Sequence, residues 1–130
     1  MTDSIAAGLR TEGPNAWLRY FDQTPGFFMA SDGSMAFPSN DSATKAVRNI
    51  AMVLKHADLK WGPLRIDSLT PALAQLAVPF TETLVDSSGK STTISGYFTG
   101  VAHRGEEGWK LRNAHWSIVH PAMPEKKPAR

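Results

Sequence analysis

The sequence predicts an α+β domain in which a curved antiparallel or mixed sheet packs on about three N-terminal helices. Helical spacing of apolar residues is confined to the part of the chain before residue 57, and strand-like alternation follows it. The strands are also long. A strand of thirteen residues, as expected at 108–120, would span roughly 43 Å if straight. We therefore expect the sheet to curl into a cone with an open mouth.

The length of 130 residues suits one domain, and 42% hydrophobic residues indicate a globular chain. We expect a single domain over residues 1–122 and a flexible, basic, Pro-rich tail over residues 123–130. The net charge is +2, and without Lys126, Lys127 and Arg130 of the tail the body of the chain is near neutral. No basic stripe with interleaved aromatic residues occurs elsewhere, so a nucleic-acid partner is not expected.

Several classes of chemistry are excluded by the composition. The chain has no cysteine, so disulfides, thiolate nucleophiles and cysteine metal sites are absent. Its four histidines lack metal-ligand spacing, and no cofactor motif is present. No signal peptide is visible, and no apolar run reaches the roughly 18 residues of a membrane span. We expect a cytoplasmic protein without metal or cofactor.

The first half of the chain predicts three helices. The first covers residues 4–10, and a second begins at Pro14, where the missing N–H of proline is harmless. The third is capped by Asn40 or Asp41 and carries an apolar stripe at helical spacing. Its stripe consists of Ala43, Val47, Ile50, Ala51 and Leu54.

Between the second and third helices, two short apolar runs flank Asp32-Gly33, which predicts a hairpin. A meander of about four long antiparallel strands then follows. The first, 59–69, is interrupted by Gly62-Pro63 and is expected to be bulged or at an edge. Residues 72–85 and 92–104 form the next two strands. Gly62, Gly96 and Gly100 are the expected bend points of the curled sheet.

The last strand, GWKLRNAHWSIVH at residues 108–120, has no consistently apolar face under strict alternation. A slip of one residue near Asn113 would place Trp109 and Leu111 on the same face as Trp116 and Ile118. We therefore expect a bulge or a strong bend at that point.

Gly108-Trp109, His115 and Ser117, after DSSGK and the strand GYFTGVAHR, resemble the nuclear transport factor 2-like superfamily, in its SnoaL-like group. The C-terminal part also resembles the association domain of calcium/calmodulin-dependent kinases. The resemblance covers roughly residues 14–119. It implies a cone-shaped α+β roll, a homodimer through the outer face of the sheet, and a pocket between sheet and helices. It implies no single function, because the superfamily contains both enzymes and non-catalytic modules.

Three residues are candidates for acid–base catalysis. A neutral imidazole at His115 in a pocket could serve as general base or acid, and the alternative is a structural or interfacial histidine. Glu82 shares an alternating face with Phe80, and an inward carboxylate has a raised pKa; the alternative is a solvated position at the cone mouth. Asp32 lies close to where the superfamily's steroid isomerases carry a carboxylate, but it also suits a plain turn.

The walls of the pocket are expected to be aromatic and apolar, with a few polar groups to orient a ligand. The expected lining residues are Trp17, Tyr20, Phe21, Phe28, Val78, Phe80, Phe98, Asn113 and Ser117. Some of the apolar members would simply be core.

Three functions are compatible with these features. The first is a SnoaL-like module whose apolar pocket holds a small hydrophobic ligand without turnover. The second is an isomerase, cyclase or hydro-lyase that uses His115 with Glu82 or Asp32. The third is a non-catalytic dimeric assembly domain. Whether the chain is an enzyme is left open by the sequence.

Overall fold

The computed structural model describes residues 1–120. The expected tail, residues 123–130, lies outside them. The helical elements are α1 (Thr2–Glu12), the 3-10 helix η1 (Pro14–Arg19) and α2 (Asn40–Val53). The strands are β1 (Phe28–Ser31), β2 (Ser34–Phe37), β3 (Leu54–Trp61), β4 (Arg65–Thr70), β5 (Leu73–Asp86), β6 (Ser91–Gly105) and β7 (Gly108–Ile118). This is the predicted α+β order of helices, hairpin, helix and meander.

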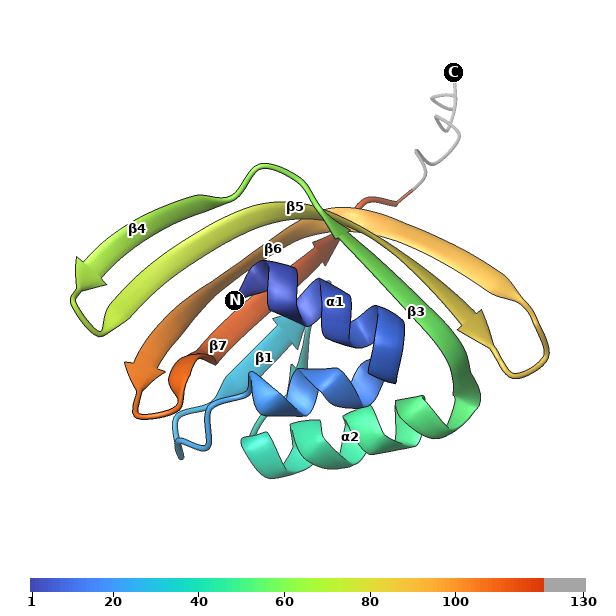
Figure 1. The fold of residues 1–130 in the computed structure, drawn as a ribbon, viewed down its shortest axis with the longest axis horizontal. Helices are drawn as coiled ribbons and strands as arrows, with labels where there is room; N and C mark the ends of the chain where they lie inside the picture. The colour runs from blue at the N-terminus through green and yellow to red at the C-terminus, as the bar shows by residue number, and fades with distance from the viewer. Residues whose placement is uncertain (121–130) are drawn as a thin grey trace, which may run out of the picture.

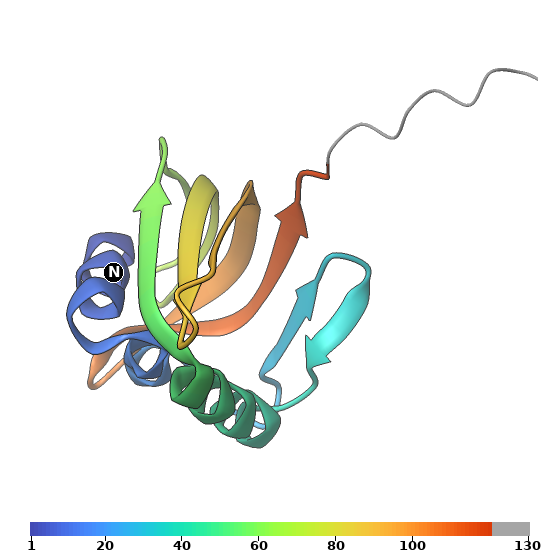
Figure 2. The same cartoon turned by 90° about the vertical axis from the view of Figure 1, so that its right-hand side faces the viewer.

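A single curved sheet forms the body of the molecule and arches over the helices (Figure 1). Its strand order is β2-β1-β7-β6-β5-β3, and β4 pairs with the other half of β5 beyond β3. All neighbouring strands are antiparallel except β1 and β7. Figure 2 shows α1 on the opposite side of the molecule from the β1–β2 hairpin, with α2 at the base. The helices therefore lie on the concave face of the sheet.

Local sequence explains where α2 begins and where the β1–β2 hairpin turns. The Ser39 hydroxyl accepts a hydrogen bond from the Ser42 N–H, and the Ser42 hydroxyl accepts one from the Ser39 N–H. Both central residues of the β1–β2 turn have positive φ, 45° at Asp32 and 91° at Gly33, as a two-residue hairpin turn requires. The helix ends one residue earlier than its apolar stripe predicts, because Leu54 already starts β3.

The first long strand is broken at Gly62-Pro63, as predicted, and becomes two strands on the same edge of β5. Gly62 donates its N–H to the Pro79 carbonyl, and a side chain at residue 62 would meet the Pro79 ring at 2.6 Å. Only glycine fits this close approach. The break begins a separate six-residue edge strand, β4, whose residues are all exposed.

The slip predicted in the last strand is confirmed. Val101 pairs with Asn113 and Ala102 pairs with Leu111, so Arg112 is an extra residue in β7. The bulge places Leu111 and Trp109 on the same inner face as Trp116, and all three belong to or pack against the core.

The concave face is filled at its centre by aromatic rings. Trp116 lies 4.5 Å from Phe98, 4.7 Å from Phe80 and 5.4 Å from Trp17, measured between ring centroids. Trp61 adds a further ring and donates its Nε1–H to the Thr2 carbonyl oxygen, which ties the start of α1 to the sheet. The curl of the sheet is thus closed over an aromatic core and not over an empty cone.

Within residues 1–120, no helix combines the length and the apolar character that crossing a membrane would require.

Candidate functional site

The structure corrects the expected pocket walls. Trp17, Phe21, Val78, Phe80 and Phe98 are all buried in the core cluster, where they contact one another and the helices. The alternation in β5 predicts an inward face for Val78 and Phe80, and both are buried, but side chains of the sheet and of the helical segment meet there and leave no room between them. None of the five borders the apolar cavity of the concave face described below.

Two further wall residues lie elsewhere. Phe28 is 41% exposed because it points to the outer face of the sheet, while its neighbours Phe27 and Met29 enter the core. Tyr20 is half-buried at the end of η1, and the Arg19 guanidinium lies 5.8 Å from the centre of its ring. Neither borders the interior cavity described below.

The bulge at Arg112 also decides which face the polar residues of β7 occupy. Beyond it, Ala114 and Trp116 point inward, so Asn113, His115 and Ser117 point to the outer face. His115 lies opposite Thr99 and beside Ala30, and it is exposed. The Ser117 hydroxyl donates to the Tyr97 carbonyl oxygen at 3.3 Å. The expectation that these three residues line an interior pocket is therefore corrected.

Asp32 occupies the hairpin turn, as its alternative interpretation predicts. Its N–H donates to the Trp116 carbonyl oxygen, and its Oδ2 lies 2.6 Å from His120 Nε2. Both side chains are partly or largely exposed. This pair joins the β1–β2 hairpin to the end of β7 and lies at the surface of the molecule.

Glu82 does point to the inner face of the sheet, directly opposite Leu59 and Ile94. Burial among these apolar neighbours disfavours the charged carboxylate and raises the pKa of Glu82 to about 7. Such a group can exchange a proton near neutral pH. However, His115 is on the other face and Asp32 is at the hairpin turn, so the three catalytic candidates do not converge.

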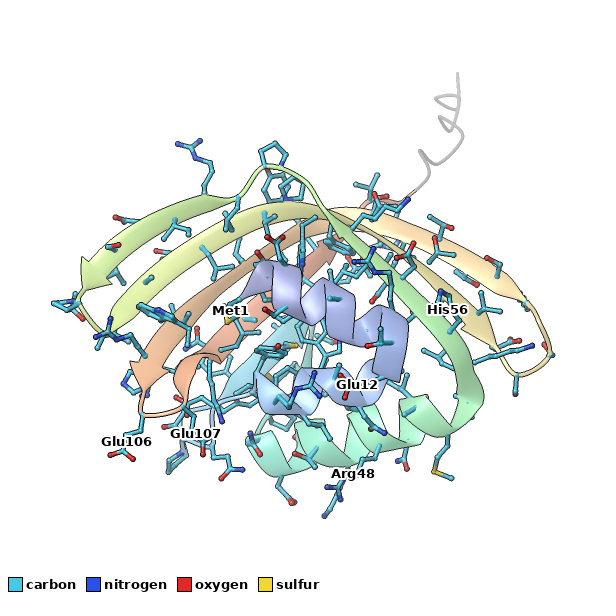
Figure 3. All side chains as sticks on the ribbon, viewed as in Figure 1. Met1, Glu12, Arg48, His56, Glu106 and Glu107 are labelled. Atoms are coloured by element: carbon cyan, nitrogen blue, oxygen red, sulfur yellow. The ribbon has the colours of Figure 1, made fainter. Side chains whose placement is uncertain are left out.

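The concave face does contain an apolar cavity, at the end of the sheet where β4 borders β5. Its volume is about 290 Å³. The cavity exists because the inner face carries small residues here, Ala74 and Ala102, in place of aromatic rings. Met1 lies under the arch of the sheet at this end, as Figure 3 shows. The lining residues are Met1, Thr2, Leu64, Ile66, Ser68, Ala74, Leu76, Ala102 and Trp109.

The lining of this cavity combines exposed apolar side chains with hydroxyl groups. Ile66 is 62% exposed and Leu64 is 40% exposed, which is unusual for large apolar side chains facing inward. Hydroxyls of Thr2 and Ser68 provide polarity, and no side chain that titrates borders the cavity. Sequence reasoning missed it. The available signal was the alternation of Leu64, Ile66 and Ser68, but periodicity does not show which inward positions meet a helix.

A second feature that the sequence did not reveal is a contact between the side chains of His103 and Asp22. His103 Nδ1 lies 3.5 Å from Asp22 Oδ2, on the outer side of the sheet near the β6–β7 turn. An open polar cleft of about 400 Å³ borders the two side chains and includes Glu106, Glu107 and Lys110. Lys110 is already paired with Glu107 at 2.9 Å. Among residues 1–120, no group of three or more acidic or histidine side chains is arranged to hold a metal ion.

The helices and the curled mixed sheet together define the nuclear transport factor 2-like fold. A superfamily protein of that name from Salmonella enterica superimposes with a TM-score of 0.74, at 13% identity, over 99% of this chain and 92% of its own. A protein from Novosphingobium aromaticivorans described as a scytalone dehydratase gives a TM-score of 0.79, at 10% identity, over 99% and 89%.

A third similar structure, from Xanthomonas campestris, is described as a calcium/calmodulin-dependent protein kinase II association domain. Its TM-score is 0.72, at 21% identity, over 96% of this chain and 84% of its own. No family model matches the sequence, and no curated protein matches it. At these identities the similarity establishes the fold, which is the one that the sequence resemblance predicted.

Proposed function

We propose that this chain is a SnoaL-like small-molecule-binding protein whose apolar cavity holds a small hydrophobic ligand without chemical turnover. The observation that carries the proposal is the lining of the cavity beneath β4. It combines inward apolar side chains with two hydroxyls and contains no side chain able to act as an acid or base near neutral pH.

The exposure of Ile66 and Leu64 supports this proposal. Both side chains face a concave surface and remain in contact with water. A ligand that covers them removes apolar surface from water, which favours binding. A volume of about 290 Å³ lies just below the roughly 300–1,000 Å³ usual for ligand sites. A compact ligand, such as a monoterpene or a simple phenol, matches both properties.

An isomerase, cyclase or hydro-lyase is the alternative, and the raised pKa of Glu82 is the observation that favours it. A buried carboxylic acid with a pKa of about 7 is suited to proton transfer. Against this, Glu82 does not border the cavity. Neither of the other two catalytic residues expected from the sequence, His115 and Asp32, lies near Glu82 on the inner face. The binding function therefore fits the geometry better.

Two expectations from the sequence stay predictions. One is the homodimer through the outer face of the sheet, which would also suit a non-catalytic assembly domain. The other is a cytoplasmic location. Neither is needed for the proposed binding function, which depends on the cavity alone.

The binding function is tested by thermal denaturation in the presence of small terpenes, phenols and medium-chain fatty acids. A ligand that binds only the folded state raises the melting temperature by mass action. Ser68→Phe should fill the cavity from β4 and remove the response. Gln75→Phe is the matched control, because Gln75 is exposed on the outer face of the adjacent strand.

The expected result is a concentration-dependent rise in melting temperature for the wild type and Gln75→Phe, and none for Ser68→Phe. Absence of a response to every compound class, or an equal response in all three proteins, would overturn the assignment of the cavity. Conversion of a bound compound into a product would favour the enzymatic alternative.

A further inference from the structure

The edge strand β4 has an exposed outer edge. It pairs with β5 on one side, and within residues 1–120 no other strand pairs with it (Figure 1). Every second residue of such a strand directs its N–H and C=O away from the sheet, where they are free to pair with another strand. All six residues of β4 are exposed, and Pro63 and Pro71 limit the available segment on either side.

The side chains of β4 alternate between the two faces of the sheet. Ile66 and Ser68 share the inner face with Leu76 and Ala74 of β5, and Arg65 and Asp67 share the outer face with Ala77 and Gln75. The outer face of this edge therefore carries a positive charge and a negative charge two residues apart. The inner face carries an exposed isoleucine between them.

This arrangement is self-complementary in one register. If a second copy pairs antiparallel about a two-fold axis at Ile66, Arg65 lies opposite the partner's Asp67, and Asp67 lies opposite the partner's Arg65. Ile66 then lies against the partner's Ile66. Opposite charges directly across a strand pair are stabilising, and so are paired β-branched residues.

The neighbouring registers are disfavoured by the same charges. A two-fold axis at Arg65 would place two arginines opposite each other, and an axis at Asp67 would place two carboxylates together. A shift by a single residue between the strands would place inner side chains opposite outer ones. The charge pattern thus selects the register centred on Ile66.

We propose that two copies of this chain associate edge to edge through β4, in antiparallel register about Ile66, to form one continuous sheet. The pairing covers Ile66, which is 62% exposed in the single chain. The interface is a different surface from the outer sheet face, and it adjoins the cavity, because Ile66 also borders that cavity.

Charge reversal tests this interface by sedimentation velocity over a concentration series. Asp67→Arg places arginine opposite arginine at both pairs, and Arg65→Asp places carboxylates there, so each variant should dimerise roughly tenfold more weakly or worse. An equimolar mixture of the two variants restores both ion pairs and should dimerise as the wild type does. The double variant Arg65→Asp/Asp67→Arg should also dimerise alone.

Cysteine cross-linking tests the register independently, because the natural chain contains no cysteine. Ile66→Cys should form a disulfide-linked dimer under mild oxidation, since residue 66 lies opposite itself. Ser68→Cys should not, since it lies opposite the partner's Leu64. A wild type that stays monomeric at every concentration would overturn the proposal. So would a dimer unaffected by both charge reversals, which would assign the contact to another surface such as the outer sheet face.

Discussion

The rings of Trp61 and Trp116 stack with their centroids 6.1 Å apart and their planes inclined by 22°, although β5 and β6 lie between their strands. The curl of the sheet brings the two strands toward each other. Gly96 and Gly100 lie close to β7, where a Cβ atom would meet the carbonyl oxygens of Ser117 and Asn113. The contact closes the centre of the concave face, so that the cavity lies at one end of the sheet.

Replacement of Trp116 by leucine should lower the free energy of unfolding by about 2–4 kcal/mol, because it removes ring contacts and leaves a cavity in the core. Urea denaturation followed by circular dichroism measures the loss. Tyr97→Leu is the control, since Tyr97 is exposed on the outer face of β6 and should change stability by less than about 0.5 kcal/mol. Equal effects of the two substitutions would contradict the aromatic core.

Gly96→Ala should destabilise the protein by about 3 kcal/mol or more, because a methyl group there would lie 1.8 Å from the Ser117 carbonyl oxygen. That oxygen belongs to the backbone of β7 and cannot move without distorting the β6–β7 pairing. Gly105→Ala, at the end of the same strand, meets no atom within 4 Å and should be nearly neutral. The comparison is made by thermal unfolding. A stable Gly96→Ala variant would show that β6 and β7 are farther apart.

Glu82 should make stability depend on pH in a specific direction. Its pKa is raised from 4.5 to about 7 in the folded state, so the folded chain binds an extra proton between those values. The free energy of unfolding should therefore fall as pH rises from about 4.5 to about 7, by roughly 3 kcal/mol for this group.

Glu82→Gln should remove that fall, since an amide does not titrate, and should be the more stable protein above pH 7. Chemical denaturation of both proteins between pH 4 and pH 8 isolates the contribution, because all other groups are shared. Parallel pH profiles for the two proteins would mean that the carboxyl group is solvated in the folded state.

His115→Ala should leave ligand binding in the cavity unchanged, because the imidazole lies on the outer face of β7. Dissociation constants for any compound identified by thermal denaturation provide the measurement. The surface position also predicts a change in stability below about 0.5 kcal/mol. A large loss of affinity in this variant would mean that His115 contacts the ligand, which would require a different path of β7.

The sequence alone determined the order of the helices and strands and the positions at which strands are bulged or interrupted. Helical spacing before residue 57 and alternation after it predict the α+β fold, because each period reflects a local backbone geometry. The slip in the last strand was also visible locally, since only a bulge brings Trp109 and Leu111 onto the same face as Trp116. Gly62-Pro63 likewise marked the point where the edge strand breaks.

Only the tertiary structure decided which inward residues meet and which leave space. Alternation assigns Phe80, Glu82 and Ala74 to the same face of β5, yet Phe80 packs against Trp116, Glu82 lies opposite Leu59, and Ala74 borders the cavity. The reason is physical. A side chain's face is fixed by its own strand, whereas its neighbours depend on how the whole sheet curls over the helices. The apolar cavity therefore lies beneath β4, and His115 lies on the opposite face of the sheet.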